Sequence, residues 1–200
     1  MEKPHLTFWF DFASTYSYLS AMRIGDMARD RGVAVTWQPF LLGPIFHAQG
    51  WDTSPFRIYP AKGVYMWRDM QRLTAARGLP FLDTPPDHWP AHSVLAARVA
   101  QLALKHPEGP EFCRQVYLAE FRDGAEIAAP ETLATCLTRA GLSAALVDTA
   151  TEPQNKAALR QVVETAQAKG IFGAPSFTVG DELFWGDDRL DAALDWAATS

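Results

Sequence analysis

The pattern of apolar residues at the start of the chain is the feature that most restricts its fold. Every second residue from Leu6 to Phe12 is large and apolar, which is typical of a β-strand with one strongly apolar face. Between Tyr16 and Arg31 the apolar residues would fall on all sides of a helix and not in one stripe, which indicates a helix buried over much of its circumference. Gly32 is a suitable C-terminal end for this helix. Residues Val33 to Trp37 predict a second strand that ends at Pro39. A strand, a helix and a strand in close succession indicate a βαβ unit with two parallel strands.

The middle of the chain changes to helical periodicity. Between about Pro60 and Gly141 the strand pattern disappears, and we expect helices at residues 65–77, 93–105, 111–122 and 131–140. Proline at position 130 and glycine at position 141 mark the two ends of the last of these helices. A helical block therefore follows the βαβ unit.

Strand character returns near the C-terminus. A helix with one apolar stripe ends at Gly170, and two short strands follow at residues 176–179 and 182–185. Gly180-Asp181 between them is typical of a two-residue hairpin turn with glycine first, and Leu190 begins a final helix. The order βαβ, helical block, αββα predicts an α/β fold with a helical insertion.

Composition and charge exclude several classes of protein. A chain of 200 residues forms one ordinary domain with room for an insertion, and it needs no disulfide or metal to hold its core. The net charge of −5 disfavours a nucleic-acid-binding protein, which needs a basic face. The apolar runs are too short for a membrane span and the N-terminal segment lacks a signal-peptide core, so we expect a cytoplasmic protein. Cys113 and Cys136 lie in amphipathic helical patterns and are expected to be reduced core thiols.

Three segments carry residues suited to chemistry. Ser14 lies where the first strand meets the first helix, a position that favours an anion such as a thiolate, although a serine there is also a common helix cap. Ala174-Pro175 precedes a strand and is a candidate cis peptide. Asp187 and Asp188 precede the last helix, where one acid can cap the helix and two acids can hold an ammonium group.

Together these segments resemble a known family. The resemblance rests on the motifs at residues 11–19, 59–69, 170–177 and 186–190, in this order around a helical insertion. The chain resembles the 2-hydroxychromene-2-carboxylate isomerases, relatives of the kappa-class glutathione transferases. The resemblance implies a DsbA-like thioredoxin fold, with a thioredoxin-like domain at residues 1–44 and 153–200 and a helical domain at residues 45–152 inserted between its βαβ and ββα halves.

The resemblance also implies the chemistry. In that family a serine replaces the first cysteine of a C-x-x-C motif and binds the thiol of glutathione, and Ser14 holds that place here, with Ser17 at the second. Disulfide exchange needs a thiolate nucleophile, so two serines exclude it. We expect Ser14 to stabilise the thiolate of bound glutathione, which adds to an electron-poor alkene, permits rotation about the carbon–carbon bond and then leaves. The substrate class implied is an aromatic, carboxylate-bearing α,β-unsaturated ketone.

Further residues receive roles by the same resemblance. The Ile171 backbone and Pro175 would line the peptide part of glutathione, and Asp188 with Asp187 would hold its ammonium group. Lys62 is expected to bind a carboxylate of glutathione or substrate, although without the family a solvated lysine is the alternative. A homodimer is also expected, since members of the family are typically dimers.

The chain departs from the family pattern around the expected substrate. Thr15 replaces a proline, and His47, Trp51 and His92 stand where lysine, asparagine and asparagine are usual; with Tyr65 the last three are candidate substrate-binding residues. We expect no metal, because Trp89-Pro90 interrupts the His88-x-x-x-His92 spacing. The alternatives are a kappa-like transferase that conjugates electrophiles and a non-catalytic DsbA-like binding protein.

Overall fold

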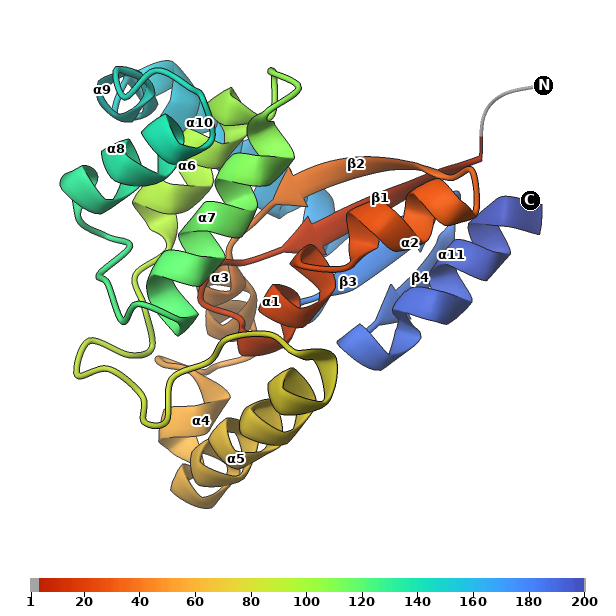
Figure 1. The fold of residues 1–200 in the computed structure, drawn as a ribbon, viewed down its shortest axis with the longest axis horizontal. Coiled ribbons are helices and arrows are strands. Elements are labelled where there is room, and N and C mark those ends of the chain that lie inside the picture. The colour runs from red at the N-terminus through yellow and green to blue at the C-terminus, as the bar shows by residue number, and fades with distance from the viewer. Residues whose placement is uncertain (1–3, 200) are drawn as a thin grey trace.

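The computed structural model describes residues 4–199 and is built around one four-stranded sheet (Figure 1). The strand order is β2-β1-β3-β4. β1 (His5–Phe10) runs parallel to β2 (Ala34–Pro39), and β3 (Ser176–Val179) runs antiparallel to both β1 and β4 (Glu182–Trp185). Phe8 pairs with Trp37 on one side and with Phe177 on the other, so the two ends of the chain meet at the centre of the sheet.

The βαβ unit is present, with one difference from the expected helix. The predicted helix at residues 16–31 is divided into α1 (Thr15–Ala21) and α2 (Ile24–Asp30). Arg23 leaves the helical region at φ −121° and its guanidinium binds the buried Asp187 carboxylate at 2.8 Å. The break in the helix thus coincides with a contact to a distant segment, which the local pattern does not report.

The helical block contains the expected helices and three that the pattern missed. The helices between β2 and the C-terminal part are α3 (Leu42–Ala48), α4 (Pro55–Ile58), α5 (Pro60–Arg77), α6 (Val94–Ala103), α7 (Gly109–Phe121), α8 (Pro130–Arg139) and α9 (Leu146–Ala150). The helices missed are α3, α4 and α9, which are too short to show helical periodicity. α5 also begins before the predicted residue 65, with a proline in its first turn.

The C-terminal part follows the predicted order. α10 (Pro153–Ala168) precedes the β3–β4 hairpin, and the 3₁₀ turn η1 (Asp187–Arg189) leads into α11 (Leu190–Thr199). Gly180 has a φ of +57°, as the first residue of the predicted two-residue turn requires. The hairpin prediction is confirmed.

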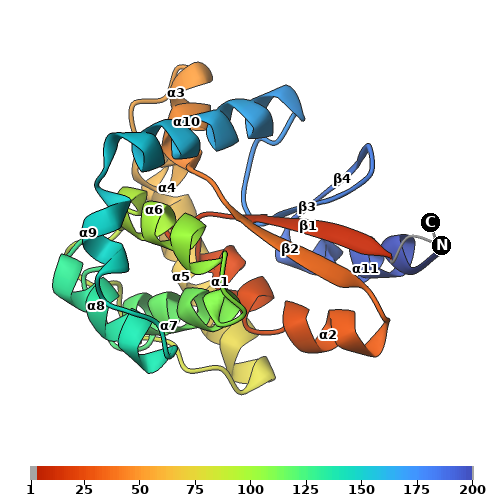
Figure 2. The ribbon, with the colours of Figure 1, turned by 90° about the horizontal axis from the view of Figure 1, so that it is seen from above.

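Two apolar cores cover the two faces of the sheet (Figure 2). α2 and α11 lie on one face of the sheet, where Phe8 and Phe10 belong to the larger core. α3 and α10 lie on the other face, where Trp9 packs with Ile45 and Ala166 in the smaller core. Successive side chains of β1 therefore enter different cores, as strand alternation requires.

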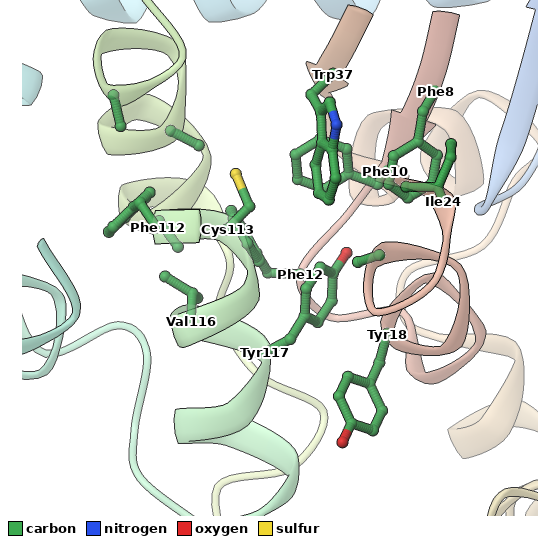
Figure 3. Close-up of a cluster of buried hydrophobic side chains, with 14 of the residues drawn as sticks. Phe8, Phe10, Phe12, Tyr18, Ile24, Trp37, Phe112, Cys113, Val116 and Tyr117 are labelled. Carbon is green, nitrogen blue, oxygen red and sulfur yellow. The ribbon is translucent and has the colours of Figure 1, made fainter. Parts of the chain in front are cut away.

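The helical block shares the larger core with the sheet. Figure 3 shows side chains of α7, including Cys113 and Tyr117, in the cluster that contains Phe12 and Trp37. The rings of Tyr117 and Phe12 lie with centroids 5.0 Å apart. The division into residues 1–44 with 153–200 and residues 45–152 stays a prediction, and its first boundary falls within α3.

None of the helices between residues 4 and 199 combines the length and the apolar character that crossing a membrane requires.

Candidate active site

A cavity of about 850 Å³ opens beside the start of α1. Its walls come from the turn before α1, from α3 to α5, from the start of α6 and from the segment before β3. Six of the residues predicted from the sequence line it: Ser14, His47, Trp51, Lys62, Tyr65 and His92. The fold thus brings together positions that lie up to 78 residues apart in the chain, since 92 − 14 = 78.

Ser14 caps α1 and also faces the cavity. Its hydroxyl accepts a hydrogen bond from the Ser17 N–H (3.2 Å) and donates one to the Ala174 carbonyl (2.9 Å). The Ser14 N–H donates to the backbone carbonyl of Asp11 at 2.9 Å. The interpretations of Ser14 as a helix cap and as part of an anion site are therefore compatible, because the hydroxyl that caps the N-terminus of α1 also forms part of the cavity wall.

The Ala174-Pro175 bond is cis, as expected. Pro175 is buried, and its carbonyl accepts the Gly186 N–H at 2.9 Å, which ties the segment to the end of β4. Gly173 and Ala174, rather than Pro175, line the cavity. The two residues before Pro175 therefore form this part of the cavity wall.

Two aromatic residues at this wall were missed by the sequence analysis. Phe172 and Trp185 line the cavity, are 47% and 53% exposed, and have ring centroids 5.0 Å apart. A Cβ atom at Gly173 would lie 2.3 Å from the indole Nε1 of Trp185, so glycine permits this indole to pack on the segment. Phe172 lies in the motif at residues 170–177 and Trp185 ends the predicted strand at residues 182–185, but neither pattern shows that these rings face a cavity.

Ile171 lies next to this wall with its side chain in the smaller core. Its N–H donates to the Ala166 carbonyl at 3.0 Å and closes α10. Only the carbonyl of Ile171 therefore remains for a ligand among its backbone groups.

The two adjacent aspartates have different surroundings. The side chain of Asp187 is 5% exposed, and its carboxylate accepts hydrogen bonds from Ser20 (2.9 Å), Arg23 (2.8 Å) and Arg77 (2.9 Å). The side chain of Asp188 is 73% exposed and lies 3.3 Å from Arg189. Asp187 thus joins α1, α5 and η1, whereas the expected role of Asp188, with Asp187 beside it, in holding an ammonium group stays a prediction.

Cationic side chains lie along the α4–α5 side of the cavity. Arg57, which the sequence analysis did not single out, joins Lys62 there, and its guanidinium donates to the Trp89 carbonyl at 3.4 Å. Tyr65 is 61% exposed and stacks under Arg72, with 5.7 Å between the guanidinium carbon and the ring centroid. This side of the cavity suits an anionic, partly aromatic ligand.

Two titratable groups at the cavity have pKa values displaced by burial. Burial raises the pKa of the Asp11 carboxyl, against hydrogen bonds from Leu42, Ser93 and Ala13 that lower it. Burial and the hydrogen bond to Asp69 raise the pKa of Tyr16. Tyr16 is therefore a neutral hydrogen-bonding group at physiological pH.

The two histidines of the His88-x-x-x-His92 spacing have separate places. His92 lines the cavity, whereas Nε2 of His88 lies 3.4 Å from the buried carboxylate of Glu120 on α7. Among residues 4–199, no three His, Cys, Asp or Glu side chains are grouped so that they could hold a metal ion.

Comparison with known proteins agrees with this architecture. The model of the DSBA-like thioredoxin domain matches residues 5–196. A 2-hydroxychromene-2-carboxylate isomerase of Sphingobium xenophagum is 29% identical over 93% of this chain and 94% of its own length, and one of Pseudomonas putida is 25% identical over 92% and 89%.

Solved structures show the same fold. A 2-hydroxychromene-2-carboxylate isomerase matches with a TM-score of 0.84 at 23% identity, covering 98% of this chain and 94% of that one. The cytosolic disulfide reductase DsbM of Pseudomonas aeruginosa, solved with GSH, matches with a TM-score of 0.66 at 17% identity, covering 98% and 96%. The chain belongs to the DsbA-like thioredoxin family, and the curated relatives it is similar to are 2-hydroxychromene-2-carboxylate isomerases.

Proposed function

We propose that this protein is a glutathione-dependent isomerase that acts on 2-hydroxychromene-2-carboxylate or a close analogue. The observation that carries the proposal is the place of the Ser14 hydroxyl, at a cavity wall beside the cis Ala174-Pro175 segment. Serine at positions 14 and 17 excludes disulfide exchange at this site and leaves activation of a bound thiol. The names of the curated relatives support an isomerase, and the GSH in the DsbM structure supports glutathione as the thiol.

The Ser14 hydroxyl would stabilise the thiolate of glutathione. A free thiol has a pKa of about 8.5, so lowering it by about two units requires about 2.7 kcal/mol of differential stabilisation. Ser14 already donates to Ala174, so a bond to sulfur replaces an existing neutral bond. That exchange contributes about 1 kcal/mol, because charge-assisted bonds are about twice as strong as neutral ones. The first turn of α1, with its positive partial charge, supplies the same order again.

The thiolate would then catalyse isomerisation without being consumed. It adds to the β-carbon of the α,β-unsaturated ketone formed when the substrate ring opens, and the electron pair moves to the carbonyl oxygen. The former double bond rotates as a single bond. Return of the electron pair expels the thiolate and leaves the trans alkene with glutathione intact.

The cavity offers separate places for the two molecules. We place the peptide part of glutathione at the wall formed by Gly173 and Ala174, with Ile171 and Pro175 beside it, and we assign Lys62 to a carboxylate. Its ammonium group would reach the exposed Asp188, which is not among the residues that line the cavity. The acceptor would occupy the opposite side, among His47, Trp51, Tyr65 and His92. The ionic contacts of Asp187 leave Asp188 as the acid for the ammonium group.

Substitution of Ser14 tests the proposal directly. The assay is a pH titration of the ultraviolet absorbance of the thiolate of bound glutathione, with Ser54→Ala as the matched control. Ser54 also caps a helix and lines the same cavity, but its oxygen accepts from Phe56. We expect Ser14→Ala to raise the thiol pKa by about 0.7 unit, the equivalent of about 1 kcal/mol, and Ser54→Ala to leave it unchanged. Equal effects of both variants, or a wild type that binds no glutathione, would refute the proposal.

The same site suits a kappa-like transferase as the second candidate, because conjugation starts from the same thiolate at Ser14. The two differ in the fate of glutathione. Free thiol measured during turnover stays constant for an isomerase and falls in step with product for a transferase. A wild type that binds glutathione but turns over neither 2-hydroxychromene-2-carboxylate nor an electrophile would indicate a binding protein.

A further inference from the structure

The geometry points to Asp11 as a positioning residue that holds the acceptor side of the cavity in place through Leu42 and Ser93. This inference rests on the proposed function for its kinetic consequences. Asp11 lines the cavity three residues before Ser14, yet it is 3% exposed. An acid so deeply buried at a ligand cavity requires partners for its oxygens, and those partners belong to different walls.

The carboxyl group of Asp11 joins three segments. Its Oδ1 accepts the Ala13 N–H at 3.0 Å, in the turn that leads to α1. Its Oδ2 accepts the Leu42 N–H at 2.7 Å, at the first residue of α3. The side chain of Ser93, the residue before α6, lies close enough to this carboxyl group to lower its pKa.

Two of these segments form the acceptor side. Leu42 begins the helix that carries His47, and Ser93 directly follows His92. All four residues line the cavity. One carboxyl group therefore connects two walls of the cavity. The residues of these walls lie about fifty positions apart in the sequence, which is too far for a local turn to join them.

The hydrogen bonds of Ser14 itself do not involve this carboxyl group. Its N–H is bound by the backbone carbonyl of Asp11, which also accepts the hydroxyl of Tyr117 at 3.1 Å. Its hydroxyl is held by Ser17 and Ala174. Loss of the Asp11 side-chain bonds should therefore alter acceptor binding and spare thiol binding.

The test is Asp11→Asn, with Ser93→Ala as a milder variant and Asp52→Asn as the charge control. Asparagine keeps the shape of the side chain but replaces one of the two accepting oxygens with an NH₂ group, which cannot accept a hydrogen bond from an N–H. Asp52 is an exposed acid that lines the same cavity, so its substitution removes a charge from the cavity and leaves the contacts of Asp11 with Leu42 and Ser93, here called the clamp, unchanged. With 2-hydroxychromene-2-carboxylate as substrate, we expect Asp11→Asn to raise KM about tenfold and Ser93→Ala about threefold. The glutathione Kd and the thiolate titration should stay within twofold in both.

The outcomes are decisive in either direction. A changed thiolate titration with an unchanged acceptor KM would place Asp11 on the thiol side and overturn the inference, as would equal effects of Asp11→Asn and Asp52→Asn. If Asp11→Asn fails to fold, the KM of Ser93→Ala decides, and an unchanged value refutes the clamp. Hydrogen exchange of the Leu42 amide needs no substrate: faster exchange in a folded Asp11→Asn protein supports the clamp even if the wild type proves not to bind glutathione.

Discussion

Replacing Asp187 and Asp188 one at a time separates a residue that stabilises the fold from one that is free for a ligand. The two acids are neighbours in sequence, and the family resemblance places the ammonium group at Asp188 with Asp187 beside it. Asp187 is held by two arginines and a serine, whereas Asp188 is largely in solvent beside one exposed arginine. The two substitutions to asparagine change charge and shape equally, so any difference comes from the surroundings.

The magnitudes follow from burial. Asp187→Asn leaves Arg23 and Arg77, which are 23% and 25% exposed, without their carboxylate. Removing one partner of a buried ion pair costs about 3–5 kcal/mol, and the partial exposure of both arginines favours the lower end, about 3 kcal/mol. For a chain of this size that corresponds to a Tm lower by about 6–12 °C. Asp188→Asn should change the free energy of unfolding by less than about 0.5 kcal/mol.

Urea unfolding and calorimetric titration with glutathione measure both effects. We expect Asp187→Asn to lose stability and Asp188→Asn to lose glutathione affinity by about tenfold, the value of one charge-assisted hydrogen bond. The reasoning would be refuted if Asp187→Asn kept its stability and lost glutathione binding. A glutathione affinity that survives Asp188→Asn would remove the ammonium contact from our placement.

Three further predictions concern other buried or close-packed groups. Burial, with a smaller contribution from Glu126, raises the pKa of Glu120 to about 8. Because the unfolded chain loses the Glu120 proton at a lower pH than the folded chain does, the free energy of unfolding falls as pH rises from about 5 to 8. In urea unfolding, the stability of Glu120→Gln relative to the wild type should therefore increase over that range, and parallel curves of stability against pH would contradict this. Burial raises the pKa of Cys136 to about 11 and that of Cys113 further, so a thiol reagent should react with neither in the folded protein and with both after denaturation; rapid labelling of the native state would be inconsistent with the buried placement. Gly173→Ala should displace the exposed Trp185 indole with a stability loss below about 1 kcal/mol and weaken glutathione binding, and an unchanged Kd would exclude this wall from the binding site.

Much of the candidate site could be predicted because its motifs are local. The Ser14 cap, the cis Ala174-Pro175 bond and the Gly180-Asp181 turn each depend on residues within a few positions, and the structure contains all three. Arg57 carries no such local signal. It is an ordinary surface arginine until α4 is placed beside the cavity.

The sequence by itself determined the order of elements and the kind of chemistry available. Alternation in β1 specifies one strongly apolar face, and the absence of cysteine at positions 14 and 17 removes disulfide exchange whatever the packing. The tertiary structure decided which polar groups are occupied. Periodicity and motifs report a residue's neighbours along the chain, but Leu42 lies 31 residues from its partner Asp11, and Ser20 lies 167 residues from its partner Asp187. Burial and pairing are properties of those long-range contacts, and they distinguish the paired Asp187 from the largely exposed Asp188.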